Sequence, residues 1–325
     1  MTLYLTQEEV QSVLDMKSTL EAVEGGFREM GLGNIEMPAR VYLHFEKGVL
    51  IAMPAYMPGL DAAGTKLVTV HPENKKNYGL PAVIARIILN SPENGMPLAI
   101  MDGTYITALR TGAAGATGIK YLSREDSKEV GICGLGVQGR SQLMGLMEVR
   151  PGVKKIKVYD IIPEARDAFV KEMNGKYKGI EFVAVGSPKE AAEGSDIVIT
   201  CTPSPKAFID GAWLKKGCHV SAIGADTAAK RELMTSVIQK CDKLVVDFIP
   251  QAFVVGDFAK PKEEGVITED DIYAEMGEIV AGKKKGRTSP DEITLFKATG
   301  LAIQDVGTAH KVYQLAKEKG IGKDI

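Results

Sequence analysis

An apolar run that breaks into a glycine-rich turn limits the fold of this chain more than any other stretch. Val130-Gly131-Ile132-Cys133 leads directly into Gly134-Leu135-Gly136-Val137-Gln138-Gly139. This order is typical of a strand, a tight turn and the first turn of a helix in a dinucleotide-binding unit. Gly134 would make the turn, Gly136 would let the backbone approach a pyrophosphate, and Gly139 would let the helix lie close to the strand. The helix N-terminus would then receive the phosphate charge. A plain structural turn is the alternative on this motif alone.

A second apolar strand supports the dinucleotide interpretation. Residues 155–159 end in Asp160, 21 residues after Gly139. An acidic side chain at this place can accept hydrogen bonds from the ribose hydroxyls of NAD and would repel the 2′-phosphate of NADP. We therefore expect NAD as the cofactor, and NADP is the less favoured alternative because Arg166 lies close by in sequence.

Beyond this unit, apolar strands alternate with helical patterns. Strands are expected at 181–185, 197–201, 219–223 and 243–247, with helices at 188–192 and 232–240. Such alternation predicts a parallel, doubly wound α/β sheet of the Rossmann type.

The opening third has a different pattern. Helices at about 6–14 and 18–31 precede strands at 39–45, 49–54, 63–70, 82–89 and 98–101, which predicts an α+β domain of mainly antiparallel strands. A helix at 104–121, rich in glycine and alanine, leads into the nucleotide unit, and a last helix at about 301–318 is expected to return to the first domain. The predicted organisation is a Rossmann domain, residues 114–300, inserted in an α+β domain formed by residues 1–113 and 301–325.

Composition excludes several classes of partner. The 40 basic residues nearly balance the 42 acidic ones, so nucleic acid is not expected, and the lysine run 283–285 is interpreted as a solvated loop. The four cysteines form no C-x-x-C pair and the four histidines show no metal-ligand spacing, so we expect reduced cysteines and no metal. With a polar N-terminal segment and no apolar run of membrane-spanning length, we expect a cytoplasmic protein that does not enter the membrane.

Four charged residues outside the glycine motif could carry chemistry. Arg40 and Arg110 could grip a substrate carboxylate through their guanidinium forks. Lys66 lies in a mostly apolar strand, and a lysine that points into a closed pocket can have its pKa lowered enough to exchange protons. Asp226 follows a parallel strand, where open α/β sheets bind ligands. Each has a simpler alternative: a solvent-facing lysine, surface ion-pair arginines, and an aspartate that caps a turn.

At these residues the chain resembles the ornithine cyclodeaminase and μ-crystallin family, and within it the archaeal-type alanine dehydrogenases. The motifs that carry the resemblance occur in order along nearly the whole chain: Met37-Pro38-Ala39-Arg40-Val41-Tyr42, Val70-His71-Pro72-Glu73-Asn74, Leu89-Asn90-Ser91-Pro92, Ala108-Leu109-Arg110-Thr111-Gly112-Ala113-Ala114, Ile223-Gly224-Ala225-Asp226 and Thr299-Gly300-Leu301-Ala302-Ile303-Gln304-Asp305.

The resemblance implies a homodimer in which the α+β domain binds the substrate and forms the dimer. It also implies roles for single residues. Arg40, Lys66 and Arg110 would bind the substrate, with Lys66 and Asp226 catalytic. The implied cofactor-binding residues are Arg110, Thr111, Gly134, Gly136, Val137, Gln138, Gly139, Asp160, Thr202, Ser204, Gly224, Asp226, Lys230 and Thr299.

Three departures from the family pattern bear on the substrate and the cofactor. Ile51 stands where cyclodeaminases carry a glutamate, and an apolar side chain cannot pair with the distal ammonium of ornithine. Ala228-Ala229 replaces the frequent Pro-Gly, and Lys297-Ala298 replaces the usual Asp-Ser. The expected function is therefore an NAD-dependent alanine dehydrogenase acting on a small amino acid and its oxo acid. The alternatives are an ornithine cyclodeaminase, a Δ1-pyrroline-2-carboxylate reductase, or a crystallin-like binding protein without turnover.

Overall fold

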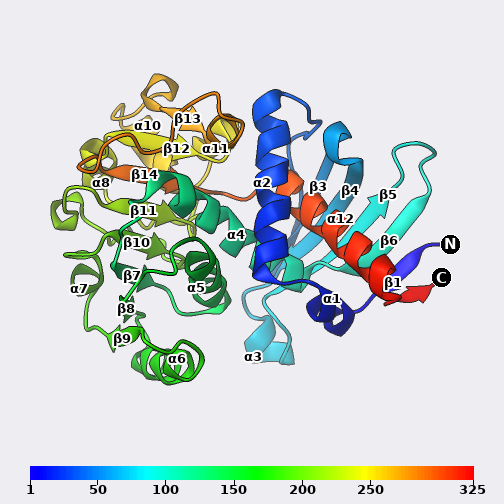
Figure 1. Cartoon of the computed structure of the whole chain (residues 1–325), viewed down its shortest axis with the longest axis horizontal. Coiled ribbons are helices and arrows are strands. Elements are labelled where there is room, and N and C mark those ends of the chain that lie inside the picture. The colour runs from blue at the N-terminus through cyan, green and yellow to red at the C-terminus, as the bar shows by residue number, and fades with distance from the viewer. The chain divides into compact units, whose positions relative to one another are not determined.

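The computed structural model describes all 325 residues (Figure 1). The chain forms two compact units. Unit 1 comprises Met1–Arg110 and Leu301–Ile325, and unit 2 comprises Thr111–Gly300. The first crossing between them falls within a single helix, α4 (Thr104–Leu122). None of the helices combines the length and apolar character needed to cross a membrane.

Unit 2 is built on an eight-stranded sheet in the order β13-β12-β14-β11-β10-β7-β8-β9, in which all neighbours are parallel. This confirms the predicted doubly wound α/β sheet. Its strands are β7 (Glu129–Cys133), β8 (Lys155–Tyr159), β9 (Glu181–Ala184), β10 (Ile197–Thr200), β11 (His219–Ala222), β12 (Lys243–Val246), β13 (Ala274–Glu275) and β14 (Thr294–Lys297). Its helices are α5 (Val137–Val149), α6 (Pro163–Lys176), α7 (Pro188–Ala192), α8 (Thr235–Lys240), α9 (Ile249–Ala252), α10 (Ala259–Glu263) and α11 (Met276–Val280).

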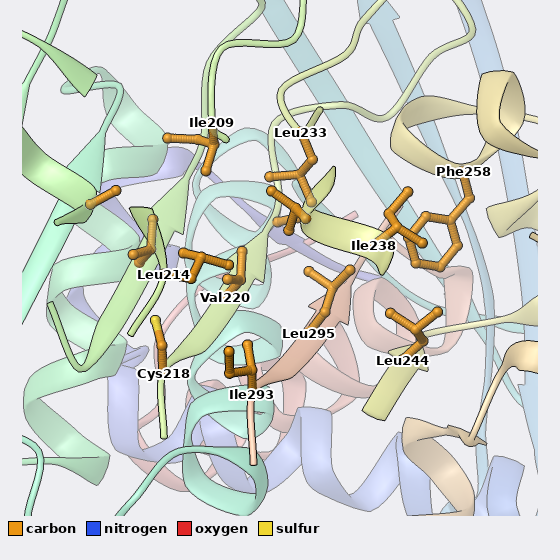
Figure 2. Packing of buried hydrophobic residues seen from close by; sticks show 14 of the residues in the cluster. Ile209, Leu214, Cys218, Val220, Leu233, Ile238, Leu244, Phe258, Ile293 and Leu295 are labelled. Atoms are coloured by element: carbon orange, nitrogen blue, oxygen red, sulfur yellow. The ribbon is translucent and has the colours of Figure 1, made fainter. Parts of the chain in front are cut away.

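The sheet of unit 2 is buried on both faces. Ile197 and Ile199 of β10 belong to one apolar cluster and Val198 belongs to the other, because successive side chains of a strand point to opposite faces. Figure 2 shows the second cluster, in which Val220 and Leu295 from neighbouring strands lie among side chains of the surrounding loops and helices. Burial on both sides explains why these strands read as continuous apolar runs in the sequence.

Unit 1 contains a seven-stranded sheet in the order β15-β1-β6-β5-β4-β3-β2. The strands β2 (Val41–Phe45), β3 (Gly48–Met57), β4 (Ala62–Val70), β5 (Val83–Asn90) and β6 (Pro97–Asp102) pair antiparallel. Two short strands are absent from the sequence prediction: β1 (Leu3–Leu5), parallel to β6, and the edge strand β15 (Lys323–Asp324), antiparallel to β1. Strands of three and two residues are too short to show an alternating pattern.

Helices α2 (Met16–Leu32) and α12 (Ala302–Lys319) cover one face of this sheet (Figure 1). The last helix, α12, packs against β3, β4 and β5 and against α2. Gly26 allows this close contact, because a Cβ there would lie 3.3 Å from the carbonyl oxygen of Ile303, which is closer than an ordinary van der Waals contact. The short helices α1 (Gln7–Val13) and α3 (Asn74–Tyr78) complete the unit.

Candidate active site

Lys66 projects from β4 to the face of the sheet that α12 covers. Its side chain is 1% exposed, and its direct neighbours across the sheet are Met53 on β3 and Ile87 on β5. Cross-strand partners point to the same face, so the aliphatic stem of Lys66 lies between two buried apolar side chains. The solvent-facing alternative for this lysine is therefore wrong.

The ammonium of Lys66 meets a carboxylate from the other end of unit 1. Lys66 Nζ lies 2.7 Å from Oδ2 of Asp305, in the first turns of α12. Arg110 Nε donates to Oδ1 of the same carboxylate at 2.9 Å, and Arg110 Nη1 donates to Gln304 Oε1 at 2.9 Å. Asp305 is fully buried, so these two cations and the start of α12 replace its hydration.

This arrangement leaves Lys66 able to exchange protons near neutral pH. Burial lowers the pKa of Lys66 to about 7; Asp305 opposes the effect, and the positive charges of Arg110 and Arg40 add to it. A lysine with a pKa near the working pH can serve as both proton donor and proton acceptor. Arg40, the third predicted substrate-binding residue, is half-buried and lies near enough for its charge to lower the pKa of Lys66.

The structure thus brings together Lys66 and Arg110 through Asp305, and Gln304 also accepts from Arg110. The sequence analysis assigned no role to Asp305 or Gln304. Asp305 and Gln304 belong to the last stretch of the family resemblance. The sequence does contain a signal for Asp305, because this residue lies among alanine, isoleucine and valine residues that α12 buries. A carboxylate in such surroundings needs a cationic partner.

In unit 2, the glycine motif has the geometry of a phosphate cradle. Gly134 has a φ of +99°, and a Cβ on Gly139 would meet the Gly134 carbonyl oxygen at 2.2 Å, so both positions need glycine. A Cβ on Gly136 would meet no atom within 4 Å, which leaves room for a ligand. No side chain caps the start of α5, so the amides around Val137 and Gln138 are not used by a capping residue. These features fit a bound pyrophosphate.

Asp160 supports this turn. Its Oδ2 accepts from the Leu135 N–H at 2.9 Å and its Oδ1 accepts from the Ile162 N–H at 3.1 Å. Each carboxylate oxygen can accept a further hydrogen bond, as from a ribose hydroxyl. Arg166 is engaged elsewhere: Nη1 donates to the Val185 carbonyl at 2.7 Å.

The other predicted cofactor residues of unit 2 lie at or near strand ends and in the α4–α5 contact. Asp226 is about half exposed and pairs with Lys230 at 2.6 Å. The Thr299 N–H donates to buried Asp247 at 2.6 Å. The remaining four positions are also hydrogen-bonded: Thr202 and Gly224 to Glu232, Ser204 to Lys206 and Arg231, and the Thr111 carbonyl to Gln142.

One departure from the family pattern acquires a structural explanation. Lys297, in place of the usual acidic residue, is fully buried at the end of β14. Its ammonium donates to the carbonyls of Ala225 at 2.5 Å and Ala298 at 3.1 Å. Nothing in the structure explains Ala228-Ala229. No group of three or more histidine, cysteine, aspartate or glutamate side chains is placed to hold a metal ion.

Comparison with known proteins agrees with the resemblance over the whole length. Residues 1–320 match the family model described as "Ornithine cyclodeaminase/mu-crystallin family". An alanine dehydrogenase of Archaeoglobus fulgidus is 46% identical over 324 residues, which cover 100% of this chain and 98% of the relative.

Two solved structures are also similar. The Δ1-pyrroline-2-carboxylate reductase of Thermococcus litoralis, in complex with NADH and L-proline, has a TM-score of 0.95 and 43% identity, with 100% of both chains covered. An archaeal alanine dehydrogenase dimer with bound NAD has a TM-score of 0.94 and 45% identity, covering 100% of this chain and 98% of that one.

Proposed function

Because the chain belongs to the ornithine cyclodeaminase/mu-crystallin family, we propose that it is an NAD-dependent oxidoreductase, specifically an alanine dehydrogenase. It would convert L-alanine, NAD and water to pyruvate, ammonia, NADH and a proton. The observation that carries the proposal is the buried Lys66–Asp305–Arg110 group, which places a lysine of pKa about 7 beside a fixed guanidinium. The similarity to an alanine dehydrogenase over the full chain supports it.

In the amination direction, Arg110 and Arg40 bind the carboxylate of pyruvate. Protonated Lys66 donates to the hydroxyl of the carbinolamine, which leaves as water, and neutral Lys66 accepts a proton from the attacking nitrogen. Asp305 keeps Lys66 and Arg110 in a fixed arrangement, because one carboxylate oxygen contacts each. NADH, when bound, supplies the hydride that reduces the resulting iminium carbon.

The cofactor is held by unit 2. The turn around Gly134 and the uncapped start of α5 receive the pyrophosphate, and Asp160 accepts from the ribose hydroxyls. Asp226, with its partner Lys230, contributes the catalytic aspartate of this unit. NAD is preferred to NADP, since Arg166 is bonded to a backbone carbonyl and lies over the Tyr159 ring.

The strand register supports a small apolar substrate. Ile51 pairs with Val68, two residues along the strands from the pair of Met53 and Lys66 and therefore on the same face of the sheet. A distal ammonium at this place would meet two aliphatic side chains and no carboxylate from these strands, so ornithine is disfavoured.

The second candidate is Δ1-pyrroline-2-carboxylate reductase. It is favoured by the structural similarity to the Thermococcus litoralis enzyme in complex with NADH and L-proline. Reduction of a cyclic imine needs the same carboxylate grip and the same hydride, but no ammonia. Ornithine cyclodeaminase activity and a crystallin-like binding role without turnover are the remaining alternatives.

The deciding experiment follows NADH oxidation by the purified protein. Pyruvate with ammonia is compared with Δ1-pyrroline-2-carboxylate, and conversion of ornithine to proline is measured in parallel. Ammonia-dependent oxidation with pyruvate supports alanine dehydrogenase, whereas turnover of the cyclic imine alone selects the reductase. Tight NADH binding with no turnover of any substrate selects the binding role.

A lysine variant tests the mechanism. Lys66→Ala is expected to abolish turnover while NADH binding, measured by fluorescence titration, is retained. Lys243→Ala is the matched control, since Lys243 is also a buried strand lysine with a carboxylate partner, Glu292. Full activity in Lys66→Ala would refute the assigned role.

The protein is further proposed to be a homodimer, as the archaeal relative with bound NAD is described. The sheet face opposite α12 exposes a run of large apolar side chains: Val41 at 56%, Leu43 at 55% and Phe45 at 49%. Exposed apolar groups concentrated on one strand are typical of an interaction surface.

A further inference from the structure

One buried carboxylate joins the ends of two neighbouring strands in unit 2. Glu232 is fully buried and accepts four hydrogen bonds. Its Oε1 accepts from the N–H and the hydroxyl of Thr202, at 2.6 and 2.8 Å. Its Oε2 accepts from the Thr200 hydroxyl and the Gly224 N–H, both at 2.8 Å. Thr200 ends β10, and Gly224 follows shortly after β11, where a parallel sheet binds its ligands.

The segment that leads to Asp226 is held from two sides. Glu232 binds the N–H of Gly224, and Lys297 binds the carbonyl of Ala225 at 2.5 Å. There is no spare room around this segment, because a Cβ at Gly224 would meet the Thr202 nitrogen at 2.3 Å. The backbone immediately before Asp226 is therefore fixed by two charged side chains.

A second carboxylate joins these two holders. Oδ1 of Asp257 accepts from the backbone N–H groups of Glu232 at 2.6 Å and Leu233 at 2.8 Å. Its Oδ2 lies 3.7 Å from Lys297 Nζ. The carbonyl of Glu232 is already engaged by the N–H groups of Phe208 at 2.8 Å and Ile209 at 3.0 Å, so α8 begins at Thr235 and not at residue 232, where the sequence predicted its start.

We propose that Glu232 is a positioning residue for the cofactor site, which it builds by tying the Thr200–Thr202 segment to the Gly224–Asp226 segment. Lys297 and Asp257 act with it by fixing the opposite side of the same turn. The inference rests on the proposed function, since Thr202, Gly224 and Asp226 are among the residues assigned to the cofactor. It adds three buried residues that do not themselves touch the cofactor.

The test is NADH binding by Glu232→Gln, measured by fluorescence titration of the full-length protein at pH 7.5. A glutamine keeps the volume, but its NH₂ group cannot accept. In either orientation it faces one fixed backbone N–H, that of Thr202 or that of Gly224. We expect the dissociation constant for NADH to rise about tenfold, because the segment that loses its hydrogen bond moves away and must return to its wild-type position when NADH binds, at a cost comparable to one buried hydrogen bond.

Glu292→Gln is the matched control. Glu292 is a buried carboxylate of the same unit that accepts from the Ser289 N–H at 3.2 Å, and it precedes β14 at the opposite end of that strand from Lys297. Both variants are expected to lower the melting temperature, but only Glu232→Gln should weaken NADH binding and lower kcat. Equal NADH affinity in Glu232→Gln and wild type would overturn the proposal.

The pH dependence of NADH affinity gives a readout that lost stability alone would not change. Burial, and then the charge of Asp257, raise the pKa of Glu232 to about 7. The other groups that face it are Lys297, beyond Asp257, and the thiols of Cys133 and Cys201, which stay neutral because burial raises their pKa. Wild-type affinity should fall as pH drops below 7, and Glu232→Gln should lack this change.

If Glu232→Gln does not fold, Thr200→Val removes a single hydroxyl donor without changing charge. It should weaken NADH binding in the same direction by a smaller factor, and unchanged binding would overturn the proposal. Failure of the proposed function is separable, because it would appear as absence of NADH binding in the wild-type protein.

Discussion

Removing the Asp305 carboxylate should change the proton chemistry of Lys66 before it changes anything else. Asp305→Asn keeps the shape of the side chain and an oxygen for Arg110 Nε, but takes away the negative charge 2.7 Å from Lys66 Nζ. Burial, the main cause of the low pKa of Lys66, remains, and the charges of Arg110 and Arg40 are no longer opposed. The pKa of Lys66 must therefore fall below its wild-type value of about 7.

The size of the effect follows from the distance. Two unit charges at 2.7 Å attract by about 6 kcal/mol at an effective dielectric constant of about 20. This is an upper limit, and a nearby opposite charge usually moves a pKa by about 1–3 pH units. A fall of that size leaves Lys66 with a pKa of about 4–6. At pH 7 the protonated fraction then drops from about one half to about one tenth or less.

The assay is the pH profile of kcat/KM for pyruvate in ammonia-dependent NADH oxidation. The limb of this profile that arises from the titration of Lys66 should move from about pH 7 in the wild type to lower pH in Asp305→Asn. The ionisation of ammonia is the same for both proteins, so it cancels in their ratio. Glu29→Gln, which alters a buried carboxylate on α2 of the same unit, should leave the limb in place. A limb that stays near pH 7 in Asp305→Asn would show that Asp305 does not control Lys66.

The remaining predictions concern stability, cofactor choice and assembly. The pKa of Lys66 is lower in the folded protein than in the unfolded chain, so the unfolded chain binds more protons between about pH 7 and 10.5. The free energy of unfolding of the wild type, relative to that of Lys66→Met, should therefore rise with pH over this range, by up to about 1.4 kcal/mol per pH unit. Urea unfolding measures it, and a pH-independent difference would contradict the prediction. Gly139→Ala should cost about 1–3 kcal/mol and weaken NADH binding, because its Cβ would overlap the Gly134 carbonyl; wild-type NADH affinity would count against the cradle. Asp160→Ser should relax discrimination against NADPH, and an unchanged NADH to NADPH ratio would exclude the assigned role. Leu43→Asp should shift the protein toward monomer in light scattering, and an unchanged mass would contradict an interface at this face.

Much of the fold follows from local patterns. The strands of unit 2 can be predicted as apolar runs because both faces of the parallel sheet are buried. The turn at Gly134 can be predicted because a φ of +99° requires glycine. The structure departs from the prediction where non-local contacts decide. The short strands β1 and β15 exist only because each pairs within the sheet, and α8 starts late because the Glu232 carbonyl is bonded to Phe208 and Ile209.

The candidate site shows the same division. The sequence by itself determined a dinucleotide turn, a parallel sheet and a set of charged residues whose chemistry suits an amino-acid substrate. It could not determine that Lys66 is buried, nor that its ammonium lies beside Asp305. A pKa depends on the loss of water and on charges a few ångströms away, and Arg110 and Asp305 are 195 residues apart in the chain. Only the tertiary structure brings α12 back onto the sheet and thereby turns a strand lysine into a group that exchanges protons near pH 7.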